Sequence, residues 1–433
     1  MQLEQLYAHF LNYPKISTDT RKIEEDSLFF ALKGDHFNGN AFAEKALDLG
    51  ARYVIIDEAD YFIDERTILV SNVLQTLQEL AKYHRSKLTI PIIGITGTNG
   101  KTTTKELLHA VLVEKYTCFA TKGNLNNHIG VPLSLLSINK EFEIAIIEMG
   151  ANHQGEIEFL SELAQPTHGL ITNVGKAHLE GFGSFEGVKK TKGELYAFLA
   201  AHQGICFIQH DNSNLVEMIA AYPSLKQIKY GFSEDNEVFG KLIKANPFLA
   251  VEWFSKKELE PHTVQTKLTG SYNTENILAA VAVGLHFDVS DKQIRLGIEK
   301  YTPQNNRSQI TQTAKNTLIE DYYNANASSM KAALENMAVI EAENKVIILG
   351  DMFELGDDSP AEHKTVIAQA KTIPTSRLIF VGKDFYAHRD GDAEYYQTTD
   401  EALEALSKHP ISSSFVLLKA SRGMAFEKLI TAL

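Results

Sequence analysis

Cysteine is scarce in this chain of 433 residues. Only Cys118 and Cys206 are present, and both stand within apolar runs that are typical of β-strands. Two isolated thiols supply neither a disulfide framework nor a cluster of thiolate metal ligands. We therefore expect two buried, reduced cysteines in a protein that works in a reducing compartment.

A surplus of basic residues is also absent. Lys and Arg number 42 against 55 Asp and Glu, which gives a formal net charge of −13. This balance argues against nucleic acid or an anionic membrane as the main partner, although a local basic pocket for phosphates is compatible with it. No run reaches the roughly 18 apolar residues that a membrane span needs, and the N-terminus lacks the basic and apolar segments of a signal peptide. We expect a cytoplasmic protein without a membrane span.

Internal repeats, low-complexity tracts and disordered tails are missing as well. A length of 433 residues, 44% of them hydrophobic, indicates a globular protein with more than one core. The patterns divide the chain into an N-terminal α/β unit (1–83), a central unit (84–302) and a C-terminal unit (303–433). Apolar strands alternate with helices in both later units, which predicts a central, mostly parallel sheet and a Rossmann-like, doubly wound C-terminal domain. The predicted fold is three-domain α/β, with an antiparallel meander over residues 237–269 and a final helix over 424–431.

The stretch 94–106, GITGTNGKTTTKE, carries the strongest chemical signal. An apolar strand pattern precedes it and a helical pattern follows it. A glycine-rich turn in that setting presents backbone N–H groups and the positive end of a helix dipole to an anion. Lys101 can bring a charge to the outer phosphates of a nucleotide, and the Thr102 hydroxyl can bind Mg²⁺. The spacing departs from GxxxxGK[ST] because Ile95 stands where that pattern needs glycine, and an ordinary glycine turn is the alternative.

Further polar residues follow strands of the predicted central sheet. Ligands of an open parallel sheet bind at the carboxyl ends of its strands, where the phosphate loop also lies. Glu148 is therefore a candidate magnesium ligand, with a solvated strand-end carboxylate as the alternative. His178 follows the next strand among three glycines, and a solvated histidine suits its position equally well. Nothing intrinsic separates Lys192 from Lys189 and Lys190, since three lysines also suit the basic face of a helix.

Asparagines are concentrated near these strand ends. Asn126 and Asn127 belong to a loop that either makes turns or donates to a polar substrate. Asn273 and Asn276 share one face of the first turn of a helix, where one can cap the helix and the other can read a base edge. The C-terminal unit has its own polar edge, whose candidates are Arg307, Asp321, Tyr323, Asn324, Asn326, Lys419 and Arg422. Of these, Arg307 and Lys419 are expected to close on phosphates held by the central domain.

Eight motifs together resemble the Mur ligase family, from about residue 17 to the C-terminus: TGTNGKTTTKE, GNLNNHIGVPLSLL, EMGA, ITNVGKAHLEGFGS, TKGEL, EDYYNANASSMKAAL, LGDMFELG and KASRGM. The last three are similar to the family member that joins D-alanyl-D-alanine to UDP-N-acetylmuramoyl-tripeptide. The resemblance implies an ATP-dependent amide ligase of peptidoglycan synthesis, expected to be a monomer. ATP would phosphorylate the tripeptide carboxylate, and the dipeptide amine would attack the acyl phosphate. A tetrahedral intermediate would then collapse to the amide, with ADP and phosphate as the other products.

The resemblance also implies a role for each candidate residue. The ATP phosphates would be held by Gly97, Thr98, Asn99, Gly100, Lys101, Thr102 and Thr103, and the rest of ATP by Asn273, Asn276, Arg307 and Asp321. Two magnesium ions would be held by Thr102, Glu148, His178 and Lys192. Lys192 would be carbamylated, which turns its cation into an anion suited to a second metal. The two substrates would meet Asp19, Arg21, Asn126, Asn127, Tyr323, Asn324, Asn326, Lys419 and Arg422, with the uridine diphosphate in the first domain.

Three positions depart from the family pattern. Asn38-Gly39-Asn40 stands where the family usually has Asp-Gly-His, which leaves the detail of uridine binding open. Asn306 replaces the usual glycine before Arg307, and Ala327 replaces a proline after Asn326. None of these changes removes a group that the implied chemistry needs.

Other functions remain open. One is the related ligase that adds the third amino acid to the same precursor. Another is a regulator in which ATP drives domain closure without catalysis. The presence of Lys101, Glu148, His178 and Lys192 together speaks against a regulator, because binding alone does not need the ligands of a second metal. A dinucleotide-dependent dehydrogenase is disfavoured, since no strand is followed by G-x-G-x-x-G with an acidic residue some ~20 positions on.

Overall fold

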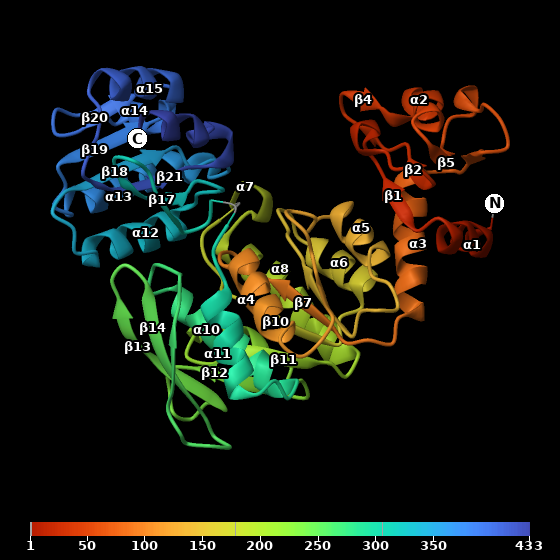
Figure 1. The fold of residues 1–433 in the computed structure, drawn as a ribbon, viewed down its shortest axis with the longest axis horizontal. Coiled ribbons are helices and arrows are strands. Elements are labelled where there is room, and N and C mark those ends of the chain that lie inside the picture. The colour runs from red at the N-terminus through yellow and green to blue at the C-terminus, as the bar shows by residue number, and fades with distance from the viewer. Residues whose placement is uncertain (1, 178, 305) are drawn as a thin grey trace.

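The computed structural model describes residues 2–177, 179–304 and 306–433, and it contains three α/β units in chain order (Figure 1). Each unit has its own sheet. The predicted three-domain α/β fold is therefore confirmed.

The N-terminal unit is built on a four-stranded parallel sheet in the order β1-β2-β5-β6. Its strands are β1 (Lys15–Ser17), β2 (Ser27–Phe30), β5 (Ala51–Ile56) and β6 (Thr67–Leu69), with a small hairpin of β3 (Lys33–Gly34) and β4 (Phe37–Asn38). Its helices are α1 (Leu3–Asn12), α2 (Ala43–Asp48) and α3 (Val73–Lys87), with 3₁₀ turns at Thr20–Lys22, Gly39–Phe42 and Ala59–Tyr61. The Asn72 side chain accepts a hydrogen bond from the Gln75 N–H and starts α3. Because α3 contacts α1 and also two helices of the central unit, it joins the two units.

The central unit has a nine-stranded sheet in the order β15-β14-β13-β12-β11-β10-β7-β9-β8. The strands are β7 (Ile92–Thr96), β8 (Cys118–Ala120), β9 (Ile144–Glu148), β10 (His168–Ile171), β11 (Ile205–Gln209), β12 (Lys226–Gly231), β13 (Val238–Ala245), β14 (Leu249–Ser255) and β15 (His262–Gln265). The antiparallel meander predicted over 237–269 is present as β13–β15, and β13 pairs in parallel with β12. The meander therefore extends the central sheet.

Both cysteines are buried and free, as predicted.

Helices cover both faces of the central sheet (Figure 1). They are α4 (Lys101–Leu112), α5 (Gly130–Leu136), α6 (Glu156–Ala164), α7 (Leu179–Phe182), α8 (Phe185–Ala201), α9 (Ser213–Ile219), α10 (Asn273–His286) and α11 (Asp291–Lys300). The apolar residues of α4, α10 and α11 fill one core, and those of α3, α5, α6 and α8 fill the other. Every residue of β7 and β9 is buried, which suits continuous apolar strands in a sheet covered on both sides.

The C-terminal unit has a six-stranded sheet in the order β16-β17-β21-β18-β19-β20, parallel except for β16. Its strands are β16 (Gln309–Gln312), β17 (Thr317–Asp321), β18 (Lys345–Gly350), β19 (Arg377–Val381), β20 (Glu394–Tyr396) and β21 (Phe415–Lys419). Its helices are α12 (Ala327–Val339), α13 (Ser359–Lys371), α14 (Lys383–Ala387) and α15 (Thr399–Lys408), with a 3₁₀ turn at Gly356–Asp358. The helix predicted over 424–431 is present in part, as the 3₁₀ helix Phe426–Ala432, and a separate 3₁₀ turn covers Arg422–Met424. Between them Ala425 has φ +53°, which interrupts a right-handed helix.

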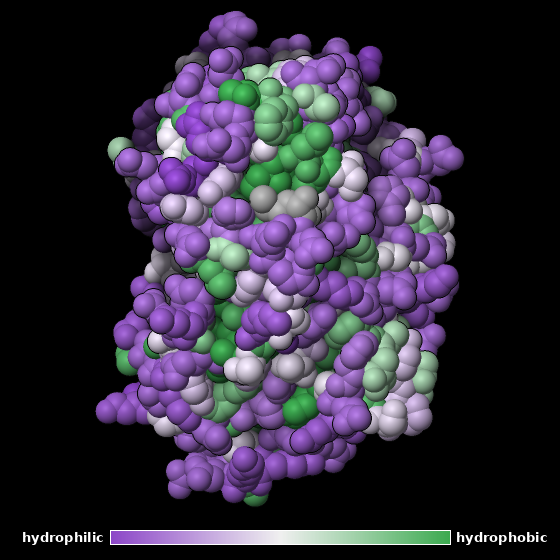
Figure 2. All heavy atoms as spheres, turned by 90° about the vertical axis from the view of Figure 1, so that its right-hand side faces the viewer, coloured by the Kyte–Doolittle hydropathy of each residue, from purple (hydrophilic) through white to green (hydrophobic). Residues whose placement is uncertain are grey.

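The surface on the side of the N-terminal unit is mainly hydrophilic, with apolar residues in a few groups (Figure 2). No helix among the residues that the structure describes combines the length and hydropathy that crossing a bilayer requires. This agrees with the absence of long apolar runs in the sequence.

A histidine pair at the amino end of β10 predicts acid sensitivity of the fold. His168 is buried, its Nε2 lies 3.1 Å from Nε2 of His286, and burial together with the His286 charge lowers the pKa of His168 to about 4. The unfolded chain, with a histidine pKa near 6.5, then binds more protons than the folded chain between pH 6.5 and 4, so stability falls as the pH falls. We expect His168 to contribute a loss of about 2–3 kcal/mol in unfolding free energy between pH 7 and pH 4.

Urea unfolding of the wild type and of His168→Gln across that pH range measures this contribution. The variant should lose less stability than the wild type on acidification. Equal losses would show that the histidine does not titrate in this way.

Candidate functional site

The phosphate loop, residues 97–100, joins the end of β7 to the start of α4. Gly97 and Gly100 have φ values of +140° and +78°, in the region that favours glycine. A Cβ on Gly97 would also lie 2.1 Å from Oγ1 of Thr172. Asn173 fixes the turn, since its carbonyl accepts from the Thr98 N–H (2.9 Å) and its side-chain oxygen from the Asn99 N–H (3.0 Å). The strand–turn–helix context expected of a phosphate cradle is confirmed.

Lys101 lies inside the curve of the loop. Its ammonium donates to the carbonyl oxygens of Gly97 (2.8 Å) and Thr98 (3.0 Å). Burial lowers the pKa of Lys101 to about 8; the nearby Glu148 carboxylate opposes this shift and the Arg307 charge adds to it. The loop lysine therefore has a carboxylate on one side and a second cation on another.

Glu148 ends β9 beside the loop, with 1% of the residue exposed. Its carboxylate accepts from the Thr102 hydroxyl at 3.0 and 3.2 Å and from Nδ2 of Asn126 at 2.8 Å. Two oxygen-bearing side chains of the type that Mg²⁺ prefers thus touch each other at the mouth of the loop. Asn126, predicted as a substrate contact, orients this carboxylate.

Lys105 belongs to the same cluster, although the sequence reasoning missed it. The side chain is fully buried, donates to the Thr121 carbonyl at 2.6 Å, and lies 3.1 Å from the Glu106 carboxylate and 3.7 Å from that of Glu148. Lys105 therefore balances the buried charge of Glu148. Its position on the apolar face of the predicted helix was the signal that could have revealed it, because a lysine there needs a buried partner.

The three lysines of α8 have different environments. Lys189 forms ion pairs with Glu186 and Glu217, and Lys190 is exposed. Lys192 is 2% exposed. Within the described part of the chain, its ammonium has a long contact (3.4 Å) with the Ala151 carbonyl and lies 5.1 Å from the centre of the Phe182 ring. Burial, reinforced by the charge of Lys101, lowers the pKa of Lys192 to about 7. Lys189 is buried as well, so burial without an ion pair among the described residues singles out Lys192. His178 lies outside the residues that the structure describes.

Asn273 and Asn276 lie behind the loop and are buried. Nδ2 of Asn276 donates to Oδ1 of Asn273 (2.8 Å), and Oδ1 of Asn276 accepts from the Thr104 hydroxyl (3.0 Å). Nδ2 of Asn273 donates to the Thr269 carbonyl at 2.7 Å. The pair ties α10 to α4, and its predicted contact with adenine stays a prediction.

A closed ring of three hydrogen bonds connects the phosphate loop to the C-terminal unit. Nδ2 of Asn99 donates to the Ser328 hydroxyl (2.8 Å), which donates to Oδ1 of Asn326 (2.8 Å). Nδ2 of Asn326 donates back to Oδ1 of Asn99 at 2.9 Å. Asn326 also caps α12, accepting from the Ser329 N–H. The N-terminus of α12 therefore lies against the loop, and Asn326 is a docking residue that no local pattern in the sequence identifies.

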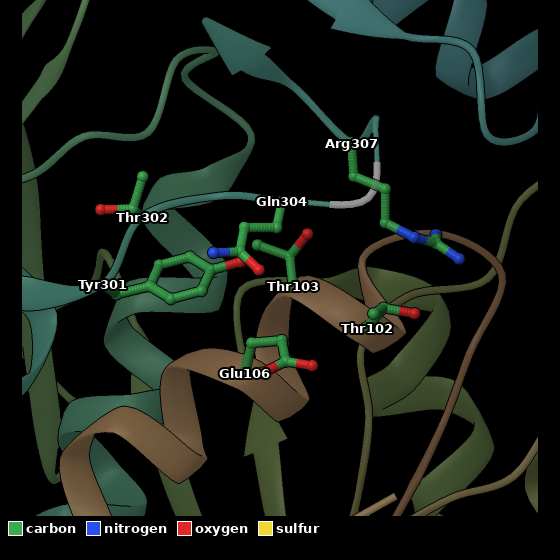
Figure 3. A pocket seen from close by; sticks show the side chains of 7 residues that line it. All are labelled: Thr102, Thr103, Glu106, Tyr301, Thr302, Gln304 and Arg307. Atoms are coloured by element: carbon green, nitrogen blue, oxygen red, sulfur yellow. The ribbon is translucent and has the colours of Figure 1, made fainter. Parts of the chain in front are cut away.

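A pocket of about 240 Å³ lies between the start of α4 and the segment that leads into the C-terminal unit. Its lining residues are Thr102, Thr103, Glu106, Tyr301, Thr302, Gln304 and Arg307 (Figure 3). Behind Arg307, Asp321 accepts from the Ser308 N–H (3.2 Å) and from the buried ammonium of Lys419 (2.7 Å). Both predicted residues Arg307 and Asp321 therefore belong to this side of the site, and Lys419 forms a buried ion pair.

Two predicted substrate contacts lie elsewhere, in the N-terminal unit. Arg21 donates to both carboxylate oxygens of Asp19, with a shortest distance of 2.7 Å. This hydrogen bonding holds the pKa of Asp19 down at about 2. A third predicted contact, Asn127 of the central unit, precedes α5, and its side-chain oxygen accepts from the Ile129 and Gly130 N–H groups. The side-chain oxygen of Asn127 is therefore engaged in a turn.

The departures from the family pattern have structural explanations. Asn306 has φ +56°, a left-handed conformation that asparagine tolerates better than most residues. Asn38 and Asn40 form a network with Asp57: Nδ2 of Asn40 donates to Asn38 and Asp57, and its Oδ1 accepts from the Asp57 N–H. Asn40 thus makes three of these bonds, two through its NH₂ group and one through its oxygen, whereas an imidazole has only two ring nitrogens to offer.

Ala327 offers a stability test. It is the first residue of α12, a position at which proline is favoured, and the preceding Asn326 has the extended backbone that proline requires (φ −147°, ψ 169°). Ala327→Pro should raise the unfolding free energy by about 0.5–1 kcal/mol by restricting the unfolded chain.

Thermal unfolding of Ala327→Pro measures this effect. Ala332→Pro, in the middle of the same helix, is the contrasting variant and should cost about 3 kcal/mol. A lower melting temperature for Ala327→Pro than for the wild type would contradict the assignment of the helix start.

Comparisons with known proteins agree with this geometry. Family models match residues 12–86 (Mur ligase family, catalytic domain), 95–284 (Mur ligase middle domain) and 306–422 (Mur ligase, glutamate ligase domain). The UDP-N-acetylmuramoyl-tripeptide–D-alanyl-D-alanine ligase of Bacillus subtilis is 34% identical over 99% of this chain and 94% of its own length, and that of Escherichia coli is 33% identical over 96% and 93%. A crystal structure of MurF from Acinetobacter baumannii superposes with a TM-score of 0.86 at 31% identity, covering 96% of this chain and 92% of its own. The chain therefore belongs to the Mur ligase family.

Proposed function

We propose that this chain is an ATP-dependent ligase that joins D-alanyl-D-alanine to UDP-N-acetylmuramoyl-tripeptide in peptidoglycan synthesis. Its B. subtilis and E. coli relatives carry that name and match nearly the whole chain. The observation that carries the proposal is the convergence on one phosphate loop of Lys101, the Thr102–Glu148 pair, the buried Lys192 and Asn326 of the C-terminal unit. Nucleotide binding alone does not require the last two groups.

The residues beside the loop fit magnesium. The Thr102 hydroxyl and the Glu148 carboxylate are in contact and supply oxygen ligands, and we propose that they hold one ion, with His178 assigned by its motif. A bound ion would neutralise charge that accumulates on the transferring phosphoryl group. An amine whose pKa is about 7 is largely neutral near physiological pH. Lys192 can therefore react with CO₂ to form a carbamate and a proton, which replaces a cation near Lys101 by an anion suited to a second ion.

The chain's own groups then account for the reaction steps. A carboxylate oxygen of the tripeptide attacks the γ-phosphorus of ATP, and ADP leaves while Lys101 and Arg307 stabilise the charge on the phosphates. The dipeptide amine attacks the acyl carbon, loses a proton, and expels phosphate with one former carboxylate oxygen. Because an acyl phosphate is hydrolysed by water, the contact of α12 with the loop serves to enclose it.

We further propose that each unit binds one substrate. Residues 1–83 bind the uridine nucleotide, residues 84–302 bind ATP and residues 303–433 bind the dipeptide. The N-terminal sheet, the loop and the C-terminal polar edge, which carries Lys419 and Arg422, support this division. Asn324 is exposed just before the docking residue Asn326, where a dipeptide can reach it.

Phosphate release from ATP tests the function. With UDP-N-acetylmuramoyl-tripeptide present, release should depend on D-Ala-D-Ala, and diamino acids should not replace the dipeptide. Release with a diamino acid but not with the dipeptide would favour the ligase that adds the third residue. Nucleotide binding without release under any condition would indicate a regulator.

A further inference from the structure

We propose that Tyr323 is a positioning residue: the face of its ring holds the Arg307 guanidinium at the phosphate loop. The guanidinium carbon of Arg307 lies 3.7 Å from the centre of the ring, and that of Arg422 lies 5.4 Å from it. At 3.7 Å a planar guanidinium is in stacking contact with the ring, which attracts the cation and leaves the N–H groups in the guanidinium plane free to donate.

The ring is the main side-chain contact that holds this arginine. Within the described part of the chain, Nε of Arg307 is buried without a hydrogen-bond partner, and no carboxylate oxygen lies within 4.0 Å of the guanidinium nitrogens. An arginine side chain has several rotatable bonds and loses considerable freedom when it is fixed. Without the ring face, little else would select one orientation of this side chain.

The backbone brings the side chains of Arg307 and Tyr323 together at a turn that hydrogen bonds hold in place. Asn306 and Ser308, on either side of Arg307, have φ values of +56° and +50°. The Tyr323 N–H donates to the Asn306 carbonyl at 3.3 Å, and the Ser308 N–H donates to Oδ1 of Asp321 at 3.2 Å. The turn that carries Arg307 is thus bonded on both sides to the segment that carries Tyr323.

The stacked arginine faces the phosphate loop. Figure 3 shows its side chain extending toward the end of α4 that carries Thr102, and both residues line the same pocket. Its charge is one cause of the lowered pKa of Lys101, so the two cations are close enough to repel each other. Two cations held close together in this way are suited to an anion between them, such as the phosphates of a nucleotide.

The geometry distinguishes this role from a direct substrate contact by the Tyr323 hydroxyl. Stacking needs the aromatic face alone, so Tyr323→Phe should keep it and Tyr323→Leu should lose it. If the ring acts through Arg307, removing the ring should add nothing once the guanidinium is gone.

The test measures the affinity of each full-length variant for a non-hydrolysable ATP analogue with Mg²⁺, by isothermal titration calorimetry without peptide substrates. The Kd should rise about tenfold in Tyr323→Leu and at least as much in Arg307→Ala. Tyr323→Phe should stay within about twofold of the wild type, and Arg307→Ala/Tyr323→Leu should equal Arg307→Ala. The matched control is Tyr386→Leu, which removes another arginine-stacked tyrosine (Arg389 at 4.6 Å) away from the loop and should bind normally.

Three results would overturn the proposal: unchanged binding in Tyr323→Leu, equal losses in Tyr323→Phe and Tyr323→Leu, or a double-variant loss equal to the product of the two single losses. Melting temperatures show whether each variant is folded. If Tyr323→Leu does not fold, Tyr323→Phe decides the test: weaker binding of the ATP analogue by Tyr323→Phe overturns the proposal, and normal binding supports it. The kcat for phosphate release should follow the same order. Only the kcat measurement rests on the proposed function. The binding measurements test the role of Tyr323 even if the chain does not catalyse the ligase reaction.

Discussion

Lys192→Ala is expected to lower turnover by about 10²–10³-fold, because it removes the carbamate that would add a second anion, besides that of Glu148, close to Lys101. Lys192 is almost fully buried and its pKa is lowered to about 7. As the pH falls below 7, the neutral amine that reacts with CO₂ is progressively protonated. At limiting bicarbonate, the activity should therefore decrease as the pH decreases. Steady-state phosphate release, with and without added bicarbonate, measures both effects.

A short carboxylate such as acetate or formate should restore part of the activity of Lys192→Ala by replacing the carbamate anion. The matched control is Lys190→Ala, which removes an exposed lysine two residues earlier on the same helix and should retain full activity. The ¹³C NMR signal of a carbamate after exposure to ¹³C-bicarbonate should appear in the wild type and be absent from Lys192→Ala. Full activity of Lys192→Ala would refute the carbamate role.

Glu148→Gln is expected to lower turnover by about 10²–10³-fold and to raise the Mg²⁺ concentration needed for half-maximal activity at least tenfold. The substitution keeps the shape of the side chain but removes the negative charge that a hard cation prefers. It also leaves Lys105 without the neighbouring buried anion. Titration of activity against Mg²⁺, together with Mn²⁺ binding followed by electron paramagnetic resonance, measures the effect without relying on turnover alone.

The control is Glu141→Gln, on the exposed turn before the same strand. It should bind Mn²⁺ like the wild type. If Glu148→Gln binds Mn²⁺ normally and loses only thermal stability, Glu148 is a structural partner of Lys105 and not a metal ligand.

The parts of this molecule that depend on local pattern could be predicted from the sequence. The apolar runs of β7 and β9, with glycines and polar residues at their ends, place the phosphate loop and Glu148 on the same edge of the sheet. Parallel strands bring such residues together by topology alone. The short strands β6 and β16 went unpredicted, because segments of three or four residues have a weak periodic signal.

Properties that arise from tertiary burial could not be predicted. Lys189, Lys190 and Lys192 are equivalent in sequence. Only the packing of α8 leaves Lys192 buried without an ion pair among the residues that the structure describes, while the buried Lys189 is paired with Glu217. The ring that joins Asn99 to Ser328 spans 229 positions, and no short-range pattern encodes it. The helix predicted over 424–431 begins only at Phe426 and is 3₁₀, because the left-handed Ala425 separates it from the preceding turn.

The central claim is that this chain makes an amide bond through an acyl phosphate, and oxygen transfer tests it most directly. UDP-N-acetylmuramoyl-tripeptide labelled with ¹⁸O in its terminal carboxylate is turned over with ATP and D-Ala-D-Ala, and the released phosphate is analysed by mass spectrometry. One labelled oxygen should appear in the phosphate for each amide formed, with no labelled phosphate when the dipeptide is omitted. Amide formation with unlabelled phosphate would contradict the acyl-phosphate route, and ATP hydrolysis without amide would contradict the ligase function itself.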